Sequence, residues 1–272
     1  MVLSLIPYWD ASADTFSPAC TFAKISSFFS LGIFENMLPP FKWCYCILET
    51  CLSLQGTGQN QQFSKFQWIK ARVKLTEEKL SRPESHKIDQ TSIQLLEKIP
   101  AGNQWGEREK YFLPYVSKSW ETILENQEKH NVSLGAFKPK LVTDFIVEPS
   151  NDEWDLSQKG ILNQTTLFST NRMPLEKIPY RFRYKFICDD SRCNGHNVII
   201  LDWEVFESYR RWKRMYRDEK LTIEKLKFKW LTYFFEQRET YFVVGTDSMF
   251  GKFMILTIVS PKRKESQLKL DL

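Results

Sequence analysis

The sequence lacks the short motifs by which many enzymes are identified. It contains no phosphate-binding loop, no nucleophile motif and no dinucleotide-binding fingerprint, so none of these reaction classes is indicated. Glycine and proline are also sparse, with 10 and 12 residues among 272. Because 42% of the residues are hydrophobic and 15% aromatic, the composition excludes a disordered chain and indicates a globular protein of one large domain or two small ones.

Long apolar runs are missing as well. The best candidate, residues 25–34, is bounded by Lys24 and Glu35 and falls far short of the roughly 20 apolar residues that a bilayer requires. Lys24 is the first basic residue, and Asp10 and Asp14 interrupt the opening apolar stretch, which argues against a secretory signal. We therefore expect a cytoplasmic protein that does not contact membranes. In that compartment its six cysteines are expected to be thiols or metal ligands.

The positive charge is unevenly distributed along the chain. Residues 170–272 hold 21 Lys and Arg against 14 Asp and Glu, whereas residues 1–169 hold 17 against 19. A basic C-terminal half suits an anionic partner such as nucleic acid. A solvated helix surface explains so small an excess equally well.

The hydrophobic pattern predicts three regions. Residues 1–43 carry few charges and no clear periodicity, residues 44–169 indicate an N-terminal α+β region, and residues 170–265 indicate a C-terminal α+β region. Apolar residues alternate with polar ones, as in half-buried strands, around residues 63–75, 140–149 and 180–187. A helix is predicted from Ser117 or Ser119 to Asn131.

The last hundred residues give the clearest pattern. A second strand, residues 197–201, follows the first across a turn at Gly195. Apolar residues then recur at helical spacing through two amphipathic helices, before two final strands. The predicted fold class is therefore α+β, with an antiparallel sheet and two amphipathic helices in the C-terminal half.

The stretch "ICDDSRCNGHNVIILDWE", residues 187–204, holds the most suggestive cluster. Cys188, Cys193 and His196 supply two sulfurs and an imidazole, the ligands that zinc selects, with four and two residues between them. A closed tetrahedral site needs a fourth ligand, for which Cys44, Cys46, Cys51, Asp190 and a water molecule are candidates. Alternatively, the two cysteines are ordinary strand-end thiols and His196 is a turn residue. On the first interpretation, a zinc ion fixes the turn between the two strands.

Two acidic residues follow in the same stretch, Asp202 and Glu204. With His196 they could hold a cation and activate water, as in a metal-dependent nuclease or related hydrolase. Asp202 also stands where the strand gives way to the helix, the N-cap position, and Glu204 in the first turn suits the helix dipole. Helix capping and the helix dipole explain these two residues without a catalytic role.

Cations surround the apolar positions of the first C-terminal helix. The apolar stripe runs from Trp203 to Tyr216, so we expect Arg210, Arg214 and Arg217 to point outward and to reach phosphates of DNA or RNA. Arg181 and Arg183 of the preceding strand would extend this surface. The alternative is a solvated helix whose arginines pair with neighbours such as Glu207.

Longer strings resemble an uncharacterised prokaryotic protein family. They are "FRYKFICDDSRCNGHNVIILDWEVFESYRR" and "YFVVGTDSMFGKFMILTIVSP", preceded by Glu49, Thr50 and Cys51, then "FSKFQWI" and "RPES". The resemblance covers roughly residues 47–260, leaves out residues 1–43, and implies one integrated domain pair without assigning an activity. The residues favour a zinc-stabilised nucleic-acid-binding protein, with a hydrolase and a protein-interaction module as the alternatives.

Overall fold

The computed structural model describes most of the second half of the chain and selected parts of the first. The described residues are 29–33, 43–47, 66–70, 72–75, 86–88, 92–100, 105–150, 177–246 and 252–263. Cys51 lies outside them, and so do residues 247–251, between the last two strands. Among the described helices, none has both the length and the apolar character of a membrane span.

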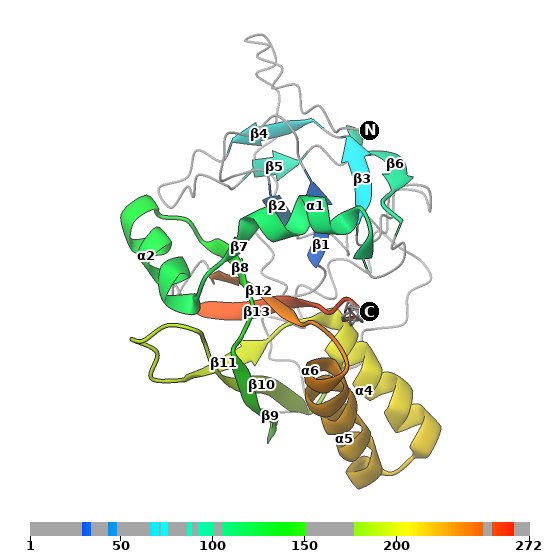
Figure 1. The fold of residues 1–272 in the computed structure, drawn as a ribbon. Helices are drawn as coiled ribbons and strands as arrows, with labels where there is room; N and C mark the ends of the chain where they lie inside the picture. Colours follow the sequence, from blue (N-terminus) through cyan, green and yellow to red (C-terminus); the bar gives the residue numbers. More distant parts are fainter. Residues whose placement is uncertain are drawn as a thin grey trace, which may run out of the picture.

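A seven-stranded sheet forms the centre of the molecule (Figure 1). Its strands are β7 (Val116–Ser117), β8 (Leu134–Phe137), β9 (Leu141–Pro149), β10 (Tyr180–Ile187), β11 (His196–Ile200), β12 (Tyr241–Thr246) and β13 (Phe253–Val259). They lie in the order β7-β8-β12-β13-β11-β10-β9. Neighbours are antiparallel except β7–β8 and β11–β13, which are parallel. The predicted α+β class is confirmed, although the sheet is mixed where the sequence predicted an antiparallel one.

The helices begin and end at recognisable caps. Ser119 caps α2 (Trp120–His130), whose last turn ends at Asn131 with φ 54°, as predicted. Asp202 caps α4 (Trp203–Tyr216), and Asp218 caps α5 (Glu219–Lys227). The helix then continues as a π-helical segment, η5 (Phe228–Tyr233), and a short α6 (Phe234–Glu236).

One face of the sheet is covered by these helices. Phe182, Tyr184 and Phe186 of β10 point into this layer and are at most 1% exposed, which confirms the predicted alternation. Phe182 packs against Phe206 of α4, and Tyr184 donates a hydrogen bond to the carbonyl of Trp230 in η5. This layer is the larger hydrophobic core. It joins the sheet to the elements that carry the candidate functional residues.

The opposite face of the sheet packs against the N-terminal region. Tyr241 and Val243 of β12 point away from the helices and join Trp68, Trp105 and Phe112 in a second core. Its elements are β3 (Gln67–Lys70), β6 (Gln94–Lys98), α1 (Arg108–Phe112) and the 3₁₀ turn η4 (Leu113–Tyr115). Two further antiparallel pairs are β1 (Phe29–Ile33) with β2 (Trp43–Ile47), and β4 (Val73–Leu75) with β5 (His86–Ile88).

The central sheet crosses one of the boundaries predicted from the sequence. Strands β7, β8 and β9 lie before residue 170 and the remaining four lie after it, yet all seven form one sheet. The boundary between residues 169 and 170 therefore falls between two strands, β9 and β10, that pair with each other.

Candidate metal centre

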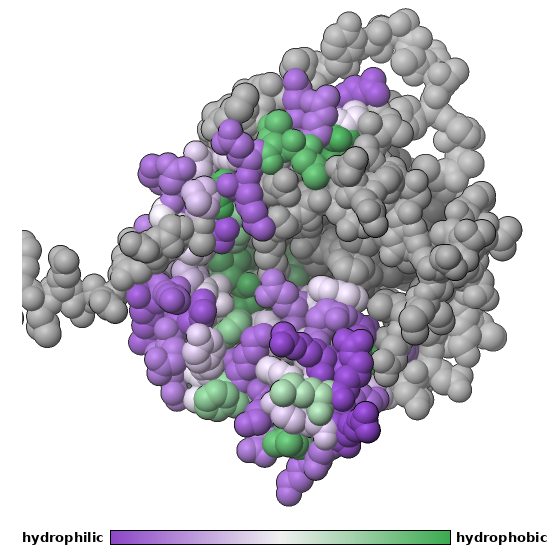
Figure 2. Space-filling model, turned by 90° about the vertical axis from the view of Figure 1, so that its right-hand side faces the viewer, coloured by the Kyte–Doolittle hydropathy of each residue, from purple (hydrophilic) through white to green (hydrophobic). Residues whose placement is uncertain are grey.

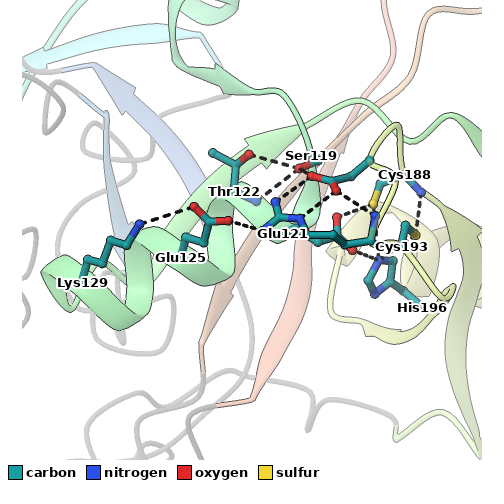
Figure 3. A network of polar contacts seen from close by, with 10 residues as sticks. Ser119, Glu121, Thr122, Glu125, Lys129, Cys188, Cys193 and His196 are labelled. Carbon is teal, nitrogen blue, oxygen red and sulfur yellow. Dashed lines mark hydrogen bonds and ion pairs between the residues drawn. The ribbon is translucent and has the colours of Figure 1, made fainter.

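Four side chains converge where α2 meets the turn between β10 and β11 (Figure 3). Cys188 follows the last residue of β10, Cys193 lies in the turn, and His196 begins β11. Glu121 comes from the first turn of α2, 67 residues earlier in the chain than Cys188. One ligand atom of each residue lies within 4.8 Å of the others, which is close enough for all four to hold one metal ion.

The contacts centre on Nε2 of His196. This atom lies 3.3 Å from Sγ of Cys193, 3.5 Å from Sγ of Cys188 and 3.2 Å from Oε1 of Glu121. The other carboxylate oxygen of Glu121 lies 2.6 Å from Sγ of Cys188. A tetrahedral zinc with bonds of about 2.0–2.3 Å would place its ligand atoms roughly 3.3–3.8 Å apart. Two of the four observed separations, 3.3 and 3.5 Å, lie in this range; the 3.2 Å separation is just below it, and the 2.6 Å contact is shorter.

The turn itself directs two backbone amides at one sulfur. Sγ of Cys193 accepts hydrogen bonds from the N–H of Cys188 at 3.3 Å and of Gly195 at 3.4 Å. Gly195 has φ +86°, a conformation that side chains disfavour. The glycine predicted to reverse the chain therefore also aims an amide at the sulfur, and amide donors of this kind stabilise a thiolate.

Burial sets the protonation of two of these groups. The pKa of Cys188 is raised to about 12, first by burial and then by the neighbouring carboxylate of Glu121. Burial lowers the pKa of His196, although Glu121 opposes this shift, so the neutral imidazole that binds metals is favoured. Without a cation the buried thiolate is strongly disfavoured beside the carboxylate. A divalent ion would remove that penalty, because thiolates must be deprotonated to coordinate it.

A second set of polar contacts holds α2 against the turn. Ser119 caps the helix and also donates to Oδ2 of Asp190 at 3.0 Å. The guanidinium of Arg192 binds both oxygens of Asp190, at 2.9 Å each, and reaches Oε1 of Glu125 one turn along the helix from Glu121. These contacts, which we call the Arg192 clamp, connect the first turns of α2, which carry Glu121, to the β10–β11 turn.

The structure brings the three predicted ligands together and places a fourth candidate group beside them. Cys188, Cys193 and His196 form one cluster, as the sequence predicted. The fourth group is Glu121, which was not among the predicted ligands, because a glutamate in the first helical turn is already explained by the helix dipole. Asp190, a candidate for this position, is engaged in the Arg192 clamp instead.

The predicted hydrolase residues do not come together. His196 begins β11, whereas Asp202 lies beyond its other end, so about six extended residues, or roughly 20 Å, separate them. Asp202 is 2% exposed and accepts the amide of Glu204 at 2.7 Å, which confirms the cap. Its second oxygen accepts from the hydroxyl of Thr257 and the amide of Ile258. All of these contacts hold secondary structure in place.

The predicted basic surface is only partly correct. Arg210 does not point outward: it packs 4.8 Å over the ring of Trp203 and pairs with Glu207 at 2.6 Å, leaving its side chain 11% exposed. Arg214 and Arg217 are exposed, as expected.

The strand arginines lie on the other side of the sheet from α4. Because Phe182 and Tyr184 face the helices, Arg181 and Arg183 point to the opposite face. Arg183 is bonded to Asn197, and Arg181 lies directly opposite Glu148 in the ladder. These two arginines therefore do not extend the surface of α4.

Two family models together match residues 52–114 and 116–272 of the chain. Residues 116–272, which include the whole sheet and all four clustered ligands, match the domain of unknown function DUF8757. Residues 52–114 match a second domain of unknown function, DUF8758. No curated protein and no solved structure matches the chain. The matches agree with the resemblance to a family without an assigned activity.

Proposed function

The chain belongs to the DUF8757 family, and from its own geometry we propose that it is a zinc-stabilised nucleic-acid-binding protein. The single observation that carries the zinc centre is the convergence of Glu121, Cys188, Cys193 and His196 within 4.8 Å. Two sulfurs and an imidazole favour zinc over magnesium or calcium, which prefer oxygen ligands. Four protein ligands complete a tetrahedron, so the zinc has a structural role and ties α2 to the β10–β11 turn.

Metal analysis and chelation test the zinc centre. Protein purified without chelator should contain about one zinc per chain, and chelation should lower Tm by roughly 5 °C or more. Glu121→Gln should weaken zinc binding, whereas Glu128→Gln, an exposed glutamate on the same helix, should leave it unchanged. Cys193→Ser should abolish both the zinc content and the effect of the chelator. Protein without stoichiometric zinc, or with an unchanged Tm after chelation, contradicts the zinc centre.

The nucleic-acid part of the proposal rests on a group of exposed cations on the hairpin formed by α4 and α5. Within the described part of the chain, no ion pair engages these side chains, which we call the hairpin cations: Arg211, Arg214, Arg217, Lys220, Lys225 and Lys227. Nearby carboxylates have other roles, because Asp218 caps α5 and Glu219 accepts from Tyr209. Residues 203–229 hold nine Lys and Arg against five Asp and Glu, so the hairpin keeps a net positive charge that suits the phosphates of DNA or RNA.

The surface character of the hairpin supports the same partner. Figure 2 looks onto the side of the molecule where α4 and α5 lie, and its lower part is mostly hydrophilic with small separate apolar patches. Met215 of α4 and Phe228 of η5 are 66% and 59% exposed. Apolar side chains among cations can stack on bases, although they can also enter a lipid surface. Binding to lipid is therefore one outcome that the experiment must distinguish.

Salt-dependent binding tests this surface with a matched pair of variants. Fluorescence anisotropy with duplex DNA and with RNA should show affinity at low salt that falls steeply as salt rises. Arg214→Gln with Arg217→Gln should flatten the log–log slope by about 0.9 for each phosphate of B-DNA that the hairpin no longer neutralises. The control, Arg181→Gln with Lys185→Gln, removes the same charge from the opposite face of the sheet and should change the slope less.

Three results would contradict nucleic-acid binding through the hairpin. The first is no affinity for DNA or RNA at low salt. The second is an equal decrease of affinity in both double variants, which would reflect net charge alone. The third is binding to vesicles of anionic phospholipid without binding to nucleic acid, which would assign the hairpin to a membrane surface.

A further inference from the structure

A surface groove lies between α4 and the π-helical segment η5. It has a volume of about 340 Å³. Three cationic side chains, Arg211, Arg214 and Lys229, line it together with the hydroxyl of Ser208 and the indole of Trp212. Glu204 and Glu207 also line the groove, and Glu207 is paired with Arg210. Two of the three cations belong to the hairpin cations, whereas Lys229 lies deeper.

Lys229 is held in place by its neighbours. Its ammonium donates to Oγ of Ser208 at 3.1 Å, and the Ser208 hydroxyl in turn donates to the carbonyl of Glu204. The rings of Trp212 and Trp230 lie 5.5 and 4.7 Å from the ammonium nitrogen. An ammonium has three N–H donors, and in the described residues one of them has a hydrogen-bond acceptor. The other two can serve a ligand in the groove.

The π-helix explains why this lysine faces the groove. A π-turn inserts a residue relative to α-helical geometry and so redirects the side chains along it, and such segments are frequent at functional sites. Within this segment, the carbonyl of Trp230 accepts a hydrogen bond from the hydroxyl of Tyr184 in the core. This hydrogen bond attaches η5 to the hydrophobic core under the helices. Burial lowers the pKa of Lys229, although the carboxylates of Glu204 and Asp202 oppose this shift.

We propose that this groove binds the phosphate of one nucleotide, with Arg211, Arg214 and Lys229 around the phosphate and Trp212 beside the base. Two guanidinium groups and an ammonium supply charge-assisted donors, and an indole offers a stacking surface that every base can use. The carboxylate of Glu204 repels phosphate, but it can accept hydrogen bonds from sugar hydroxyls or base amino groups. The inference deepens the proposed nucleic-acid binding, because a nucleotide phosphate is shared by free nucleotides, strand ends and the backbone.

Calorimetry with three small probes tests the groove directly. Adenosine 5′-monophosphate should bind the full-length protein at low salt, and adenosine should bind about tenfold more weakly or not at all. Lys229→Gln and Arg211→Gln should each weaken binding of the monophosphate by about tenfold. Lys185→Gln, an exposed cation on the opposite face of the sheet, is the control and should have little effect. Inorganic phosphate should compete with the monophosphate.

Two variants keep the test meaningful if one of them fails to fold. Lys229 contacts core rings, whereas Arg211 is exposed, so Arg211→Gln should retain the Tm of the wild type. Equal affinity for adenosine and its monophosphate, or monophosphate binding that survives both substitutions, would overturn the phosphate site. So would the absence of heat with the monophosphate at low salt.

Oligonucleotides identify the source of the phosphate and separate this inference from the proposed function. Tighter binding of a 5′-phosphorylated strand than of the unphosphorylated strand assigns the groove to a terminal phosphate. Equal affinity of the two strands, weakened by Lys229→Gln, assigns it to the backbone. Polymer binding that is unaffected by Lys229→Gln and Arg211→Gln overturns the groove and leaves the proposed function intact. Binding of the monophosphate without binding of the polymer would support the groove and overturn the proposed function.

Discussion

Single residues in the structure often have two roles, and Asp202 is the clearest case. One carboxylate oxygen caps α4 through the amide of Glu204, and the other accepts two hydrogen bonds from β13. The sequence predicts the first role, because an aspartate before an amphipathic run is a common cap. It does not predict the second, since Thr257 and Ile258 lie more than 50 residues further along the chain.

The double role changes what substitution of Asp202 should do. A cap alone tolerates Asp202→Asn, but here both oxygens accept hydrogen bonds, so the amide NH₂ must face a donor. We expect Asp202→Asn to lower the free energy of unfolding by about 1–3 kcal/mol and Asp202→Ala by about 2–5 kcal/mol. Asp218→Asn is the control, because Asp218 caps α5 with one oxygen and is exposed. A urea titration that finds the two Asn variants equally stable would contradict the second role.

Gly195 links backbone conformation to the metal centre. Its φ of +86° disfavours a side chain, although a Cβ there would meet only the carbonyl of Phe186, at 3.9 Å. We expect Gly195→Ala to cost about 1–2 kcal/mol through backbone strain and to weaken zinc binding, because its amide would no longer point at Cys193. Asn194→Ala in the same turn should do neither. Urea titration and competition with a zinc chelator measure the two effects, and a Gly195→Ala variant as stable as the wild type would contradict the strain.

Among the elements, α2 owes its position to polar contacts as well as apolar ones. Ile123 packs so closely on β8 that a Cβ on Gly135 would lie 2.8 Å from it. The Arg192 clamp holds the first turns of the same helix to the β10–β11 turn. Without the clamp, Glu121 would be free to leave the centre, although the other three ligands would remain.

The clamp is therefore expected to act through ligand position. Arg192→Gln should weaken zinc affinity by about 10- to 100-fold, the usual effect of losing groups that orient a ligand. Lys129→Gln is the control, since Lys129 also pairs with Glu125 but lies within α2 and does not reach the turn. Competition with a chromophoric chelator measures both. If the two variants bind zinc equally well, the clamp does not position Glu121.

Local sequence patterns predicted the helices, strands and caps better than they predicted which elements lie side by side in the fold. The alternation of β10, the caps of α2 and α4 and the turn at Gly195 all depend on residues close in sequence, and the structure confirms them. The parallel pairing of β11 with β13 depends on the whole topology, which periodicity does not encode. Arg210 shows the same limit, because helical spacing predicted exposure while Trp203 and Glu207 bury the guanidinium.

The candidate site was predictable to a similar extent. Three ligands lie within nine residues of one another and supply a recognisable set of zinc-binding groups, whereas Glu121 carries no signal beyond its place in a first helical turn. Folding of α2 onto the sheet brings it to the others. A long-range ligand of this kind becomes visible only when the packing of the helix is known.

At the scale of the whole molecule, one sheet contributes to two hydrophobic cores on its opposite faces. Each core contains a buried tyrosine, and these phenols make the free energy of unfolding depend on pH in the alkaline range. Burial raises the pKa of Tyr184 well above the usual 10.0, and it also raises that of Tyr241. Both phenols stay neutral in the folded protein, whereas the unfolded chain deprotonates above about pH 10. The unfolded state then binds fewer protons, so stability is complete below that pH and falls as pH rises beyond it, by at most about 1.4 kcal/mol per pH unit for each phenol.

Tyr184→Phe isolates one of these contributions. At neutral pH the variant should be less stable by about 1–3 kcal/mol, because the carbonyl of Trp230 loses its donor. Between about pH 9.5 and 11, however, it should lose less stability than the wild type, since Phe has no proton to release in the unfolded state. Urea unfolding across that range measures both, and Tyr115→Phe, which replaces a less deeply buried phenol, is the control. Parallel curves for the wild type and Tyr184→Phe would mean that the buried hydroxyl titrates in the folded protein as it does in the unfolded chain, and the core around η5 would then have to admit water or open at that pH.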